Sequence, residues 1–231
     1  IDPGHGGIDS GAVGYLSKRN PLYEKTVVLD IGLKIKTLLN KKVPNVKIVM
    51  TRDTDDTVKL FHRGTIANKN KAKLFISLHC NGNRSSRANG FETYVLGTHK
   101  DEAAREVALA ENEVIKYEDE ETSSAYTGLN LIRATMAQSA YKKESIYLAR
   151  IIDNKVGSHM KTLDIKNRGV KSAGFAVLFK PSMPSVLVEV AFITNKHEVK
   201  VLARKNDRSR IAESIAGGVL QYIKDVEALN G

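Results

Sequence analysis

A glycine-rich stretch at the start of the chain, Gly4-His5-Gly6-Gly7, holds a residue that can do chemistry. Glycine lets the backbone turn tightly and approach a bound group, so the imidazole of His5 is presented with little bulk around it. Such a setting suits a metal ligand, although an ordinary turn explains the same stretch. It is not a phosphate-binding loop, because it lacks the lysine and hydroxyl residue of the Walker pattern. Other parts of the chain must therefore supply partners for His5.

Three more residues have suitable chemistry at suitable positions. His79 follows the apolar run 74–78, which predicts a strand buried on both faces. Glu24 lies in the first turn of an amphipathic helix, where a carboxylate also suits the positive end of the helix dipole. Glu189 lies inside the apolar run 185–192, where a carboxylate is costly unless it is paired or functional.

The elements that position these residues alternate between strands and helices. This order predicts an α/β fold with a twisted, mostly parallel sheet flanked by helices. Ser145 is a candidate cap for one of the helices. We expect a polar loop over 12–23, strands over 46–51, 74–78, 90–96, 175–178 and 185–192, and helices over 24–39, 58–70, 101–116, 145–161, 195–202 and 211–223.

Ligands of open α/β sheets collect outside the carboxyl ends of the strands. His5 and His79 occupy such ends, and Glu24 opens the helix after the first strand. Two imidazoles and a carboxylate are the ligands of a catalytic zinc site that keeps its fourth position open. Zinc lowers the pKa of bound water toward ~7 and polarises a carbonyl. Glu189 is then the candidate base, because burial raises a carboxyl pKa toward neutrality.

Composition limits the functional class. The 231 residues suffice for one domain with a substantial core, and no apolar run approaches the roughly 18 residues of a membrane span. A single cysteine excludes an internal disulfide. The net charge of +10 favours an anionic partner, but the lysines are scattered and no nucleic-acid-binding signature is present. We expect a monomer that binds no nucleic acid. The chain starts abruptly at a strand end, as in a mature or trimmed protein, so the lack of a signal peptide says little about compartment.

These motifs together resemble the zinc-dependent N-acetylmuramoyl-L-alanine amidases, in the subgroup that separates daughter cells in bacteria. The family cleaves the amide between N-acetylmuramic acid and the L-alanine of the peptidoglycan stem peptide. The resemblance spans nearly the whole chain. It implies a phosphorylase/hydrolase-like fold and a periplasmic or extracellular location in the cell envelope. The matching stretches are Ile1-Asp2-Pro3-Gly4-His5-Gly6-Gly7, Glu24-Lys25, Thr51-Arg52, Ile76-Ser77-Leu78-His79-Cys80-Asn81 and the run from Pro184 to Asn195.

Carried over by position, the resemblance makes His5, Glu24 and His79 the zinc ligands and Glu189 the catalytic glutamate. The stretch between His5 and Glu24 is longer than in the family, with 15–23 as the extra material, and we expect it to form a longer rim on the substrate groove. Two alternatives remain open. One is a zinc peptidase of another substrate class, and the other is an inactive module that binds the cell wall.

Residues 99–143 are interpreted as a helical insertion on a single amidase catalytic domain that covers 1–231. Glu111 resembles the family's inhibitory glutamate, which fills the fourth zinc position and autoinhibits the enzyme. Glu113 faces another side of the helix, so both cannot reach the metal. We expect an apolar stripe in this segment to dock an activator protein, as in related divisome amidases, although packing on the core is an equal alternative. The stripe is formed by Leu129, Leu131, Ile132 and Met136.

Other conspicuous residues have ordinary interpretations. Asp2 either orients His5 or caps its own turn. The thiol of Cys80 points away from His79 in an extended segment and is expected to be packed. Two arginines could bind carboxylates of the stem peptide, but structural ion pairs are the expected role. Surface positions are expected for the remaining histidines. These are Arg52 and Arg63, and His62, His99, His159 and His197.

Overall fold

The computed structural model describes residues 1–98, 102–118 and 139–230. A five-stranded sheet lies at its centre, and three of its four strand pairings are parallel, which confirms the predicted fold class. The exception is β5, which runs antiparallel to β7. In spatial order the strands are β1 (Asp2–Pro3), β4 (Phe75–Asn81), β7 (Ser185–Phe192), β5 (Phe91–Leu96) and β6 (Asn167–Ala173).

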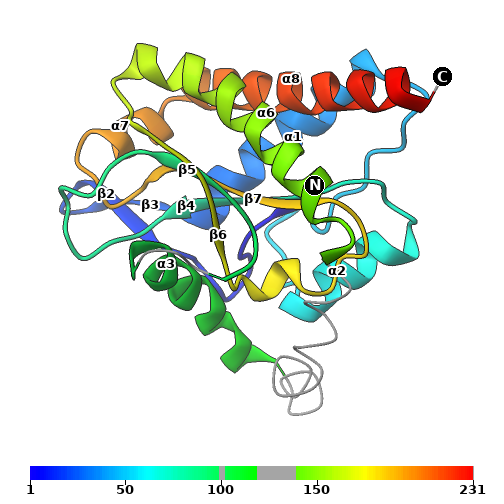
Figure 1. The fold of residues 1–231 in the computed structure, drawn as a ribbon. Coiled ribbons are helices and arrows are strands. Elements are labelled where there is room, and N and C mark those ends of the chain that lie inside the picture. Colours follow the sequence, from blue (N-terminus) through cyan, green and yellow to red (C-terminus); the bar gives the residue numbers. More distant parts are fainter. Residues whose placement is uncertain (99–101, 119–138, 231) are drawn as a thin grey trace.

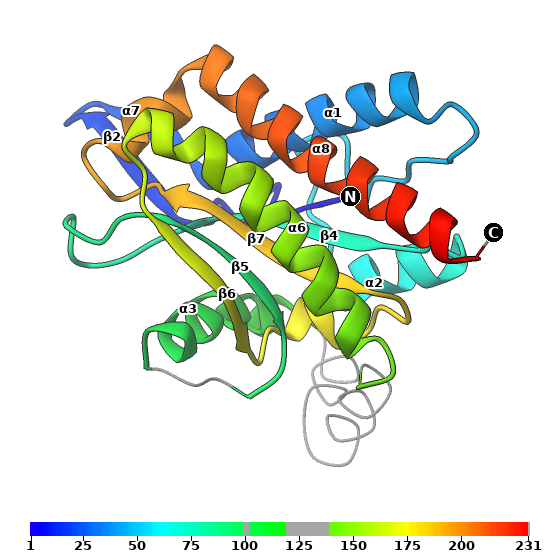
Figure 2. The same ribbon diagram turned by 45° about the horizontal axis from the view of Figure 1, so that its top comes forward.

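Helices cover both faces of this sheet (Figure 1). The first face carries α1 (Glu24–Lys42), α6 (Lys142–Met160) and α8 (Lys205–Asn230), which pack against one another over the larger part of the core. The second face carries α2 (Leu60–Lys69), α3 (Glu102–Asn112) and the 3-10 helix η3 (Ala176–Leu178). The second view shows α3 beneath the sheet and the three long helices above it (Figure 2).

Alternation along the strands decides which side chains face which helices. Leu78 and Val188 pack into the core beneath α1 and α6, whereas Leu187 packs with the second face. Because successive strand residues point to opposite faces, His79 and Glu189 face the α2 and α3 side. The smaller elements are the hairpin β2 (Val13–Ser17) and β3 (Asn20–Tyr23), α7 (Glu198–Ala203), η1 (Glu113–Tyr117) and η2 (Lys161–Leu163).

Several expected elements differ in the structure. The expected strand over 46–51 is absent, although this segment runs beside β1 and the Thr51 N–H donates to the carbonyl of Ile1. The expected loop over 12–23 is a β-hairpin, because the backbones of its two arms pair with each other. The expected strand over 175–178 is the 3-10 helix η3. No strand was expected at β6. This edge strand is polar and contains a glycine, so its sequence lacks the apolar run that indicates a strand.

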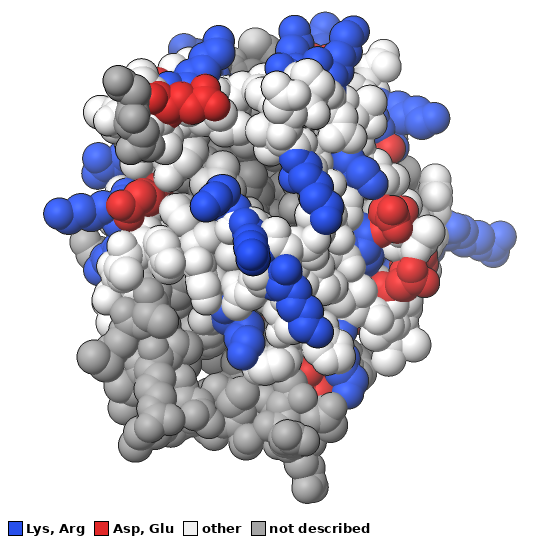
Figure 3. Space-filling view, turned by 90° about the vertical axis from the view of Figure 1, so that its right-hand side faces the viewer, with Lys and Arg blue, Asp and Glu red and all other residues white. Residues whose placement is uncertain are grey.

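Ser145 is not a helix cap, because α6 begins three residues earlier at Lys142. Its buried hydroxyl instead accepts the N–H of Ser185, which ties α6 to the start of β7. Lys and Arg side chains outnumber acids on one face of the molecule, in keeping with the net charge of +10 (Figure 3). Within the described ranges, no helix is both long and apolar enough to cross a membrane.

Candidate metal centre

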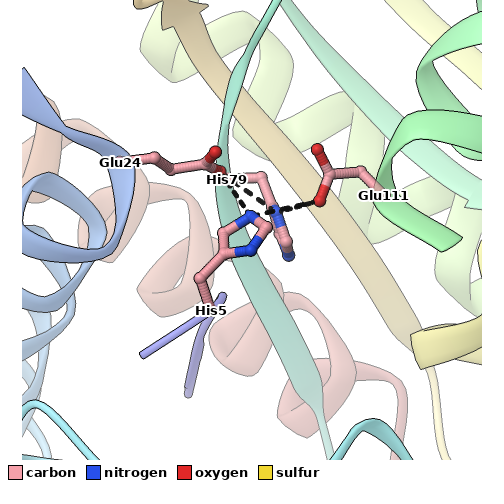
Figure 4. Close-up of side chains that lie close together, drawn as sticks. All are labelled: His5, Glu24, His79 and Glu111. Atoms are coloured by element: carbon pink, nitrogen blue, oxygen red, sulfur yellow. Dashed lines mark ion pairs between the residues drawn. The ribbon is translucent and has the colours of Figure 1, made fainter. Parts of the chain in front are cut away.

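Four side chains from four separate segments meet beside the sheet (Figure 4). Nε2 of His5 lies 3.1 Å from Oε1 of Glu24 and 3.3 Å from Oε2 of Glu111. Nδ1 of His79 lies 3.2 Å and 2.7 Å from the same two atoms. One ligand atom from each residue lies within 4.8 Å of every other. The two carboxylates approach from opposite sides, Glu24 from α1 and Glu111 from α3.

The hydrogen bonding of these atoms fits a metal ion. Nε2 of His5, Nδ1 of His79 and Oε2 of Glu111 are all buried and have no hydrogen-bond partner among the described residues. Buried polar atoms are normally hydrogen-bonded, so three unpartnered atoms that face one point need an explanation. A cation at that point would satisfy all three together with Oε1 of Glu24. Two imidazoles and two carboxylates are a donor set that Zn²⁺ accepts in tetrahedral geometry.

Glycines allow the ligands to approach one another. A Cβ on Gly4 would collide with the imidazole of His79, and a Cβ on Gly11 would lie 2.6 Å from Oε2 of Glu24. His5 itself adopts a left-handed backbone with φ of 57°, which is uncommon for a residue other than glycine. Strain of this kind persists only where the surroundings impose it. The glycines of this stretch therefore serve close packing around the site.

The surroundings of His5 impose its conformation through three contacts. Oδ2 of Asp9 lies 2.8 Å from Nδ1 of His5, which leaves Nε2 as the atom that faces the centre. Arg63 donates to the carbonyl of His5 at 2.8 Å. Arg52 donates to the carbonyl of Gly4 at 2.7 Å. A carboxylate on the far nitrogen of a histidine is the usual support of a metal ligand, because it fixes the tautomer and the ring orientation.

Glu24 is the first residue of α1 and is completely buried. Its Oε1 accepts the N–H of Cys80 at 2.7 Å, and its Oε2 accepts the N–H of Ala12 at 2.8 Å. Burial opposes ionisation, but the charge of His5 outweighs it, so the pKa of Glu24 lies below its usual value. The carboxylate is therefore held in place and ionised by protein groups.

Glu111 reaches the centre from the last turn of α3. The next residue, Asn112, anchors this end of the helix, because its side chain donates to the carbonyl of Gly174 and accepts the N–H of Ala176, each at 2.8 Å. The segment leaves a cavity of about 40 Å³ beside the two histidines. Ligand pockets usually measure about 300 to 1,000 Å³, so no sizeable substrate fits here. Glu113 points away, is exposed and pairs with Lys116.

A third buried carboxylate lies next to the centre. Glu189 pairs in register with His79 and is completely buried, and in the part of the chain that the structure describes neither of its oxygens has a hydrogen-bond partner. Burial and then the charge of Glu111 raise the pKa of Glu189 well above its usual value. A carboxyl with both oxygens uncommitted beside two imidazoles can accept and release a proton.

The four converging side chains also shift one another's titration. Burial disfavours the charged imidazole of His79, but Glu111 outweighs this and raises the pKa of His79 to about 10. The reverse holds for Glu111, whose pKa is lowered because His79 and His5 outweigh the cost of burial. In the absence of a metal, protons on the two imidazoles would balance the two carboxylates.

The remaining expectations have mixed outcomes. Asp2 neither orients His5 nor caps its turn, because its carboxylate accepts hydrogen bonds from Arg63, Thr51 and Ser77. Arg63 forms the expected ion pair with Asp2. Arg52 instead donates to the backbone carbonyls of Pro3, Gly4, Lys25 and Thr54.

The thiol of Cys80 is buried, as expected. His62 and His197 are exposed, whereas His159 is half-buried. His99 and the stripe of Leu129, Leu131, Ile132 and Met136 lie outside the described residues.

Two features of the site were missed from the sequence. Asp9, which supports His5, follows it by four residues, and the Asp9-Ser10-Gly11 pattern of a side-chain turn was the available signal. Glu92 lies opposite Glu189 in the antiparallel pair and is neutralised by Arg168 and Lys171, both at 2.9 Å. Burial opposes ionisation of Glu92, but these two cations lower its pKa. No local sequence pattern links these three residues.

The fold and the site define an α/β protein with a candidate metal centre on its central sheet. Comparison with known proteins gives the family. The family model described as N-acetylmuramoyl-L-alanine amidase matches residues 1–221. The chain is 35% identical to AmiA of Escherichia coli K12 over 226 residues, which cover 96% of this chain and 74% of AmiA. It is also 35% identical to AmiC of Escherichia coli O6:H1 over 230 residues, covering 97% of this chain and 52% of AmiC.

A solved structure has the same fold. AmiC2 of Nostoc punctiforme, an N-acetylmuramoyl-L-alanine amidase, superposes with a TM-score of 0.69 and 32% identity, covering 97% of this chain and 95% of that one. The chain therefore belongs to the N-acetylmuramoyl-L-alanine amidase family. It spans about half the length of the AmiC relative and about three quarters of AmiA.

Proposed function

We propose that this chain is a zinc-dependent peptidoglycan amidase that cleaves the bond between N-acetylmuramic acid and the L-alanine of the stem peptide. The observation that carries the proposal is the set of unpartnered atoms on His5, His79 and Glu111, which face one point together with Glu24. His5, Glu24 and His79 would hold the ion. Family membership supplies the substrate class.

Zinc bound there would polarise the scissile carbonyl and make water a stronger nucleophile near neutral pH. Glu189 is placed to take the proton of the attacking water, because its oxygens have no other partner. As the carbon–nitrogen bond breaks, Glu189 returns the proton to the departing nitrogen of L-alanine. The products are a free lactyl carboxylate and a free peptide amine. Asp9 keeps His5 in the required tautomer.

The chain is also proposed to be autoinhibited by Glu111. This carboxylate lies where a fourth ligand would bind, and a closed set of four protein ligands is typical of structural zinc sites, not catalytic ones. The cavity of about 40 Å³ agrees with a closed site. The segment around α3 must move before substrate reaches Glu189.

Control by a partner would then open the site. We propose that the stripe of Leu129, Leu131, Ile132 and Met136 docks an activator protein in the periplasm or at the cell surface, and that the enzyme acts in daughter-cell separation. This rests on the apolar pattern and on the resemblance to the cell-separation amidases. Hydrogen exchange of the isolated protein tests it, because strong protection of this stripe would mean that it already packs on the core.

Metal analysis of the purified chain, combined with dye release from labelled cell-wall sacculi, tests the main proposal. We expect one zinc per chain, and dye release that a chelator removes and added zinc restores. Release of short peptides from unrelated substrates would favour a zinc peptidase of another class. Binding to sacculi without any release, even after Glu111→Ala, would favour an inactive cell-wall-binding module.

A further inference from the structure

Polar side chains form a row across the sheet on the face that carries α2 and α3. His79 on β4 pairs with Glu189 on β7, and Glu189 pairs with Glu92 on β5. Arg168, at the irregular start of the edge strand β6, then donates from Nε to Glu92 at 2.9 Å. The four strands follow one another in this order (Figure 2). The row connects the candidate metal centre with the edge of the sheet.

The guanidinium at the end of this row has more donors than its partners use. Arginine carries five N–H donors. Nε of Arg168 binds Glu92, and Nη1 makes a long contact of 3.4 Å with the carbonyl of Asn89. Glu92 also accepts from Lys171 at 2.9 Å and from Asn81 at 2.7 Å. The single negative charge of Glu92 is therefore shared among several donors. It leaves N–H groups of Arg168 available to another acceptor.

The side chains of Glu92 and Arg168 differ in their exposure to solvent. Glu92 is completely buried, whereas the side chain of Arg168 is 25% exposed. The guanidinium carbon lies 5.3 Å from the ring centroid of Phe192, which fixes its plane. A planar guanidinium that lies against an aromatic ring and belongs to a partly exposed side chain is well suited to bind a carboxylate through two hydrogen bonds.

We propose that Arg168, held by Glu92 and Phe192, binds a free carboxylate of the stem peptide while the bond is cleaved at the metal centre. The inference rests on the proposed amidase function. Two strand spacings of about 4.8 Å place the Glu92 position roughly 10 Å from His79. An extended peptide crosses that distance in about three residues. A carboxylate on the second or third residue of the stem peptide therefore has the required reach.

Matched muropeptides test this binding site. One has free carboxyl groups, and in the others the carboxyl of the second or of the third residue is amidated. The parent protein carries Glu111→Ala, so that the centre is open. Its kcat/KM is measured for each substrate, and the Kd for each peptide is measured by calorimetry on the non-cleaving Glu111→Ala, Glu189→Gln protein.

We expect the parent to prefer one free carboxylate over its amide by about tenfold or more, the usual worth of a charge-assisted hydrogen bond. Arg168→Gln should remove this preference while leaving the amidated substrate nearly unaffected. Arg168→Lys, which keeps the charge near Glu92, should retain part of it and serves if the first variant is unstable. Arg150→Gln, an exposed arginine on α6, is the control and should keep the full preference.

Equal kcat/KM and Kd values of the parent for the free and the amidated peptides would overturn the inference. Binding of neither peptide, or a preference that survives Arg168→Gln, would do the same. The amidase function fails differently: no substrate is cleaved by any variant, while calorimetry still shows a carboxylate preference that depends on Arg168. The two failures are therefore distinguishable.

Discussion

Nδ1 of His79 lies 2.7 Å from Oε2 of Glu111, although His79 is on the inner strand β4 of the sheet and Glu111 is at the end of α3. This contact joins the segment over the site to the site itself. Both atoms are buried and lack a hydrogen-bond partner, as expected of two ligands that share an ion. The state of Glu111 should therefore control access to the centre.

Glu111→Ala is expected to raise basal hydrolysis of sacculi by about tenfold or more, because each 1.4 kcal/mol removed from the closed state changes its population tenfold. The measurement is dye release at equal zinc content. Glu113→Ala is the matched control, since this exposed neighbour only pairs with Lys116, and it should leave the rate unchanged. An equal rate for Glu111→Ala and the parent would argue against autoinhibition.

Zinc binding should depend on His79. His79→Ala removes one of three metal-holding side chains, so we expect stoichiometric zinc to be lost in elemental analysis after dialysis. His62→Ala, an exposed histidine on α2, should retain one zinc per chain. If His79→Ala kept its full metal content, the ligand assignment would be wrong.

Glu189→Gln should retain the fold and the zinc but reduce hydrolysis by about 10² to 10⁴, the usual worth of general acid–base catalysis. The amide has a nearly identical shape but cannot take the proton of water. The two proteins are compared in the Glu111→Ala background, because the inhibited enzyme would hydrolyse sacculi too slowly for a clear difference. Substantial residual turnover would move the role of the base to another group.

Asp2 should stabilise the fold in a pH-dependent way. Burial opposes its ionisation, but the charge of Arg63 and hydrogen bonds from Thr51 and Ser77 outweigh it, so the pKa of Asp2 is lowered. The ionised form is therefore favoured in the folded state. This contribution is fully present above the unfolded pKa of about 4, and it is lost as the pH falls through the lower folded pKa.

Asp2→Asn should accordingly reduce the free energy of unfolding at pH 7 by about 3 to 5 kcal/mol, as for other broken buried ion pairs. The difference from the parent should shrink steadily below about pH 4. Urea denaturation at pH 7 and pH 3 measures both values, with the exposed Asp53→Asn as control. A difference that does not change with pH would contradict the role of the ionised carboxylate.

The buried strands and the chemistry of the site were predictable, because both leave local signals. Continuous apolar runs indicated β4 and β7, and the polar residues that interrupt or end these runs, His79 and Glu189, were conspicuous for that reason. Glu24 was identified because it opens an amphipathic helix. Edge elements were not predictable in this way. β6 is polar and contains a glycine, and the two short arms of the β2–β3 hairpin show no regular alternation of apolar and polar residues that would distinguish them from a loop.

Support of the site by distant residues could not be predicted either. Arg63 and His5 are 58 positions apart, and Arg168 and Glu92 are 76 apart. Such pairs can be predicted only when the strand order is known. In this sheet β4 lies between β1 and β7, and β5 lies beyond β7. The order depends on tertiary packing, which no spacing of residues along this chain specifies.

The hydrogen bonds of Glu24 have a consequence for metal exchange. Its two oxygens are held by the N–H groups of Cys80 and Ala12, and His5 is held by Asp9 and Arg63, all without help from an ion. The proposed ligands are thus held in place by the polypeptide, and a zinc ion would enter a preformed site. The chain should therefore stay folded when stripped of zinc, and it should regain metal within the time of mixing, with no refolding step between.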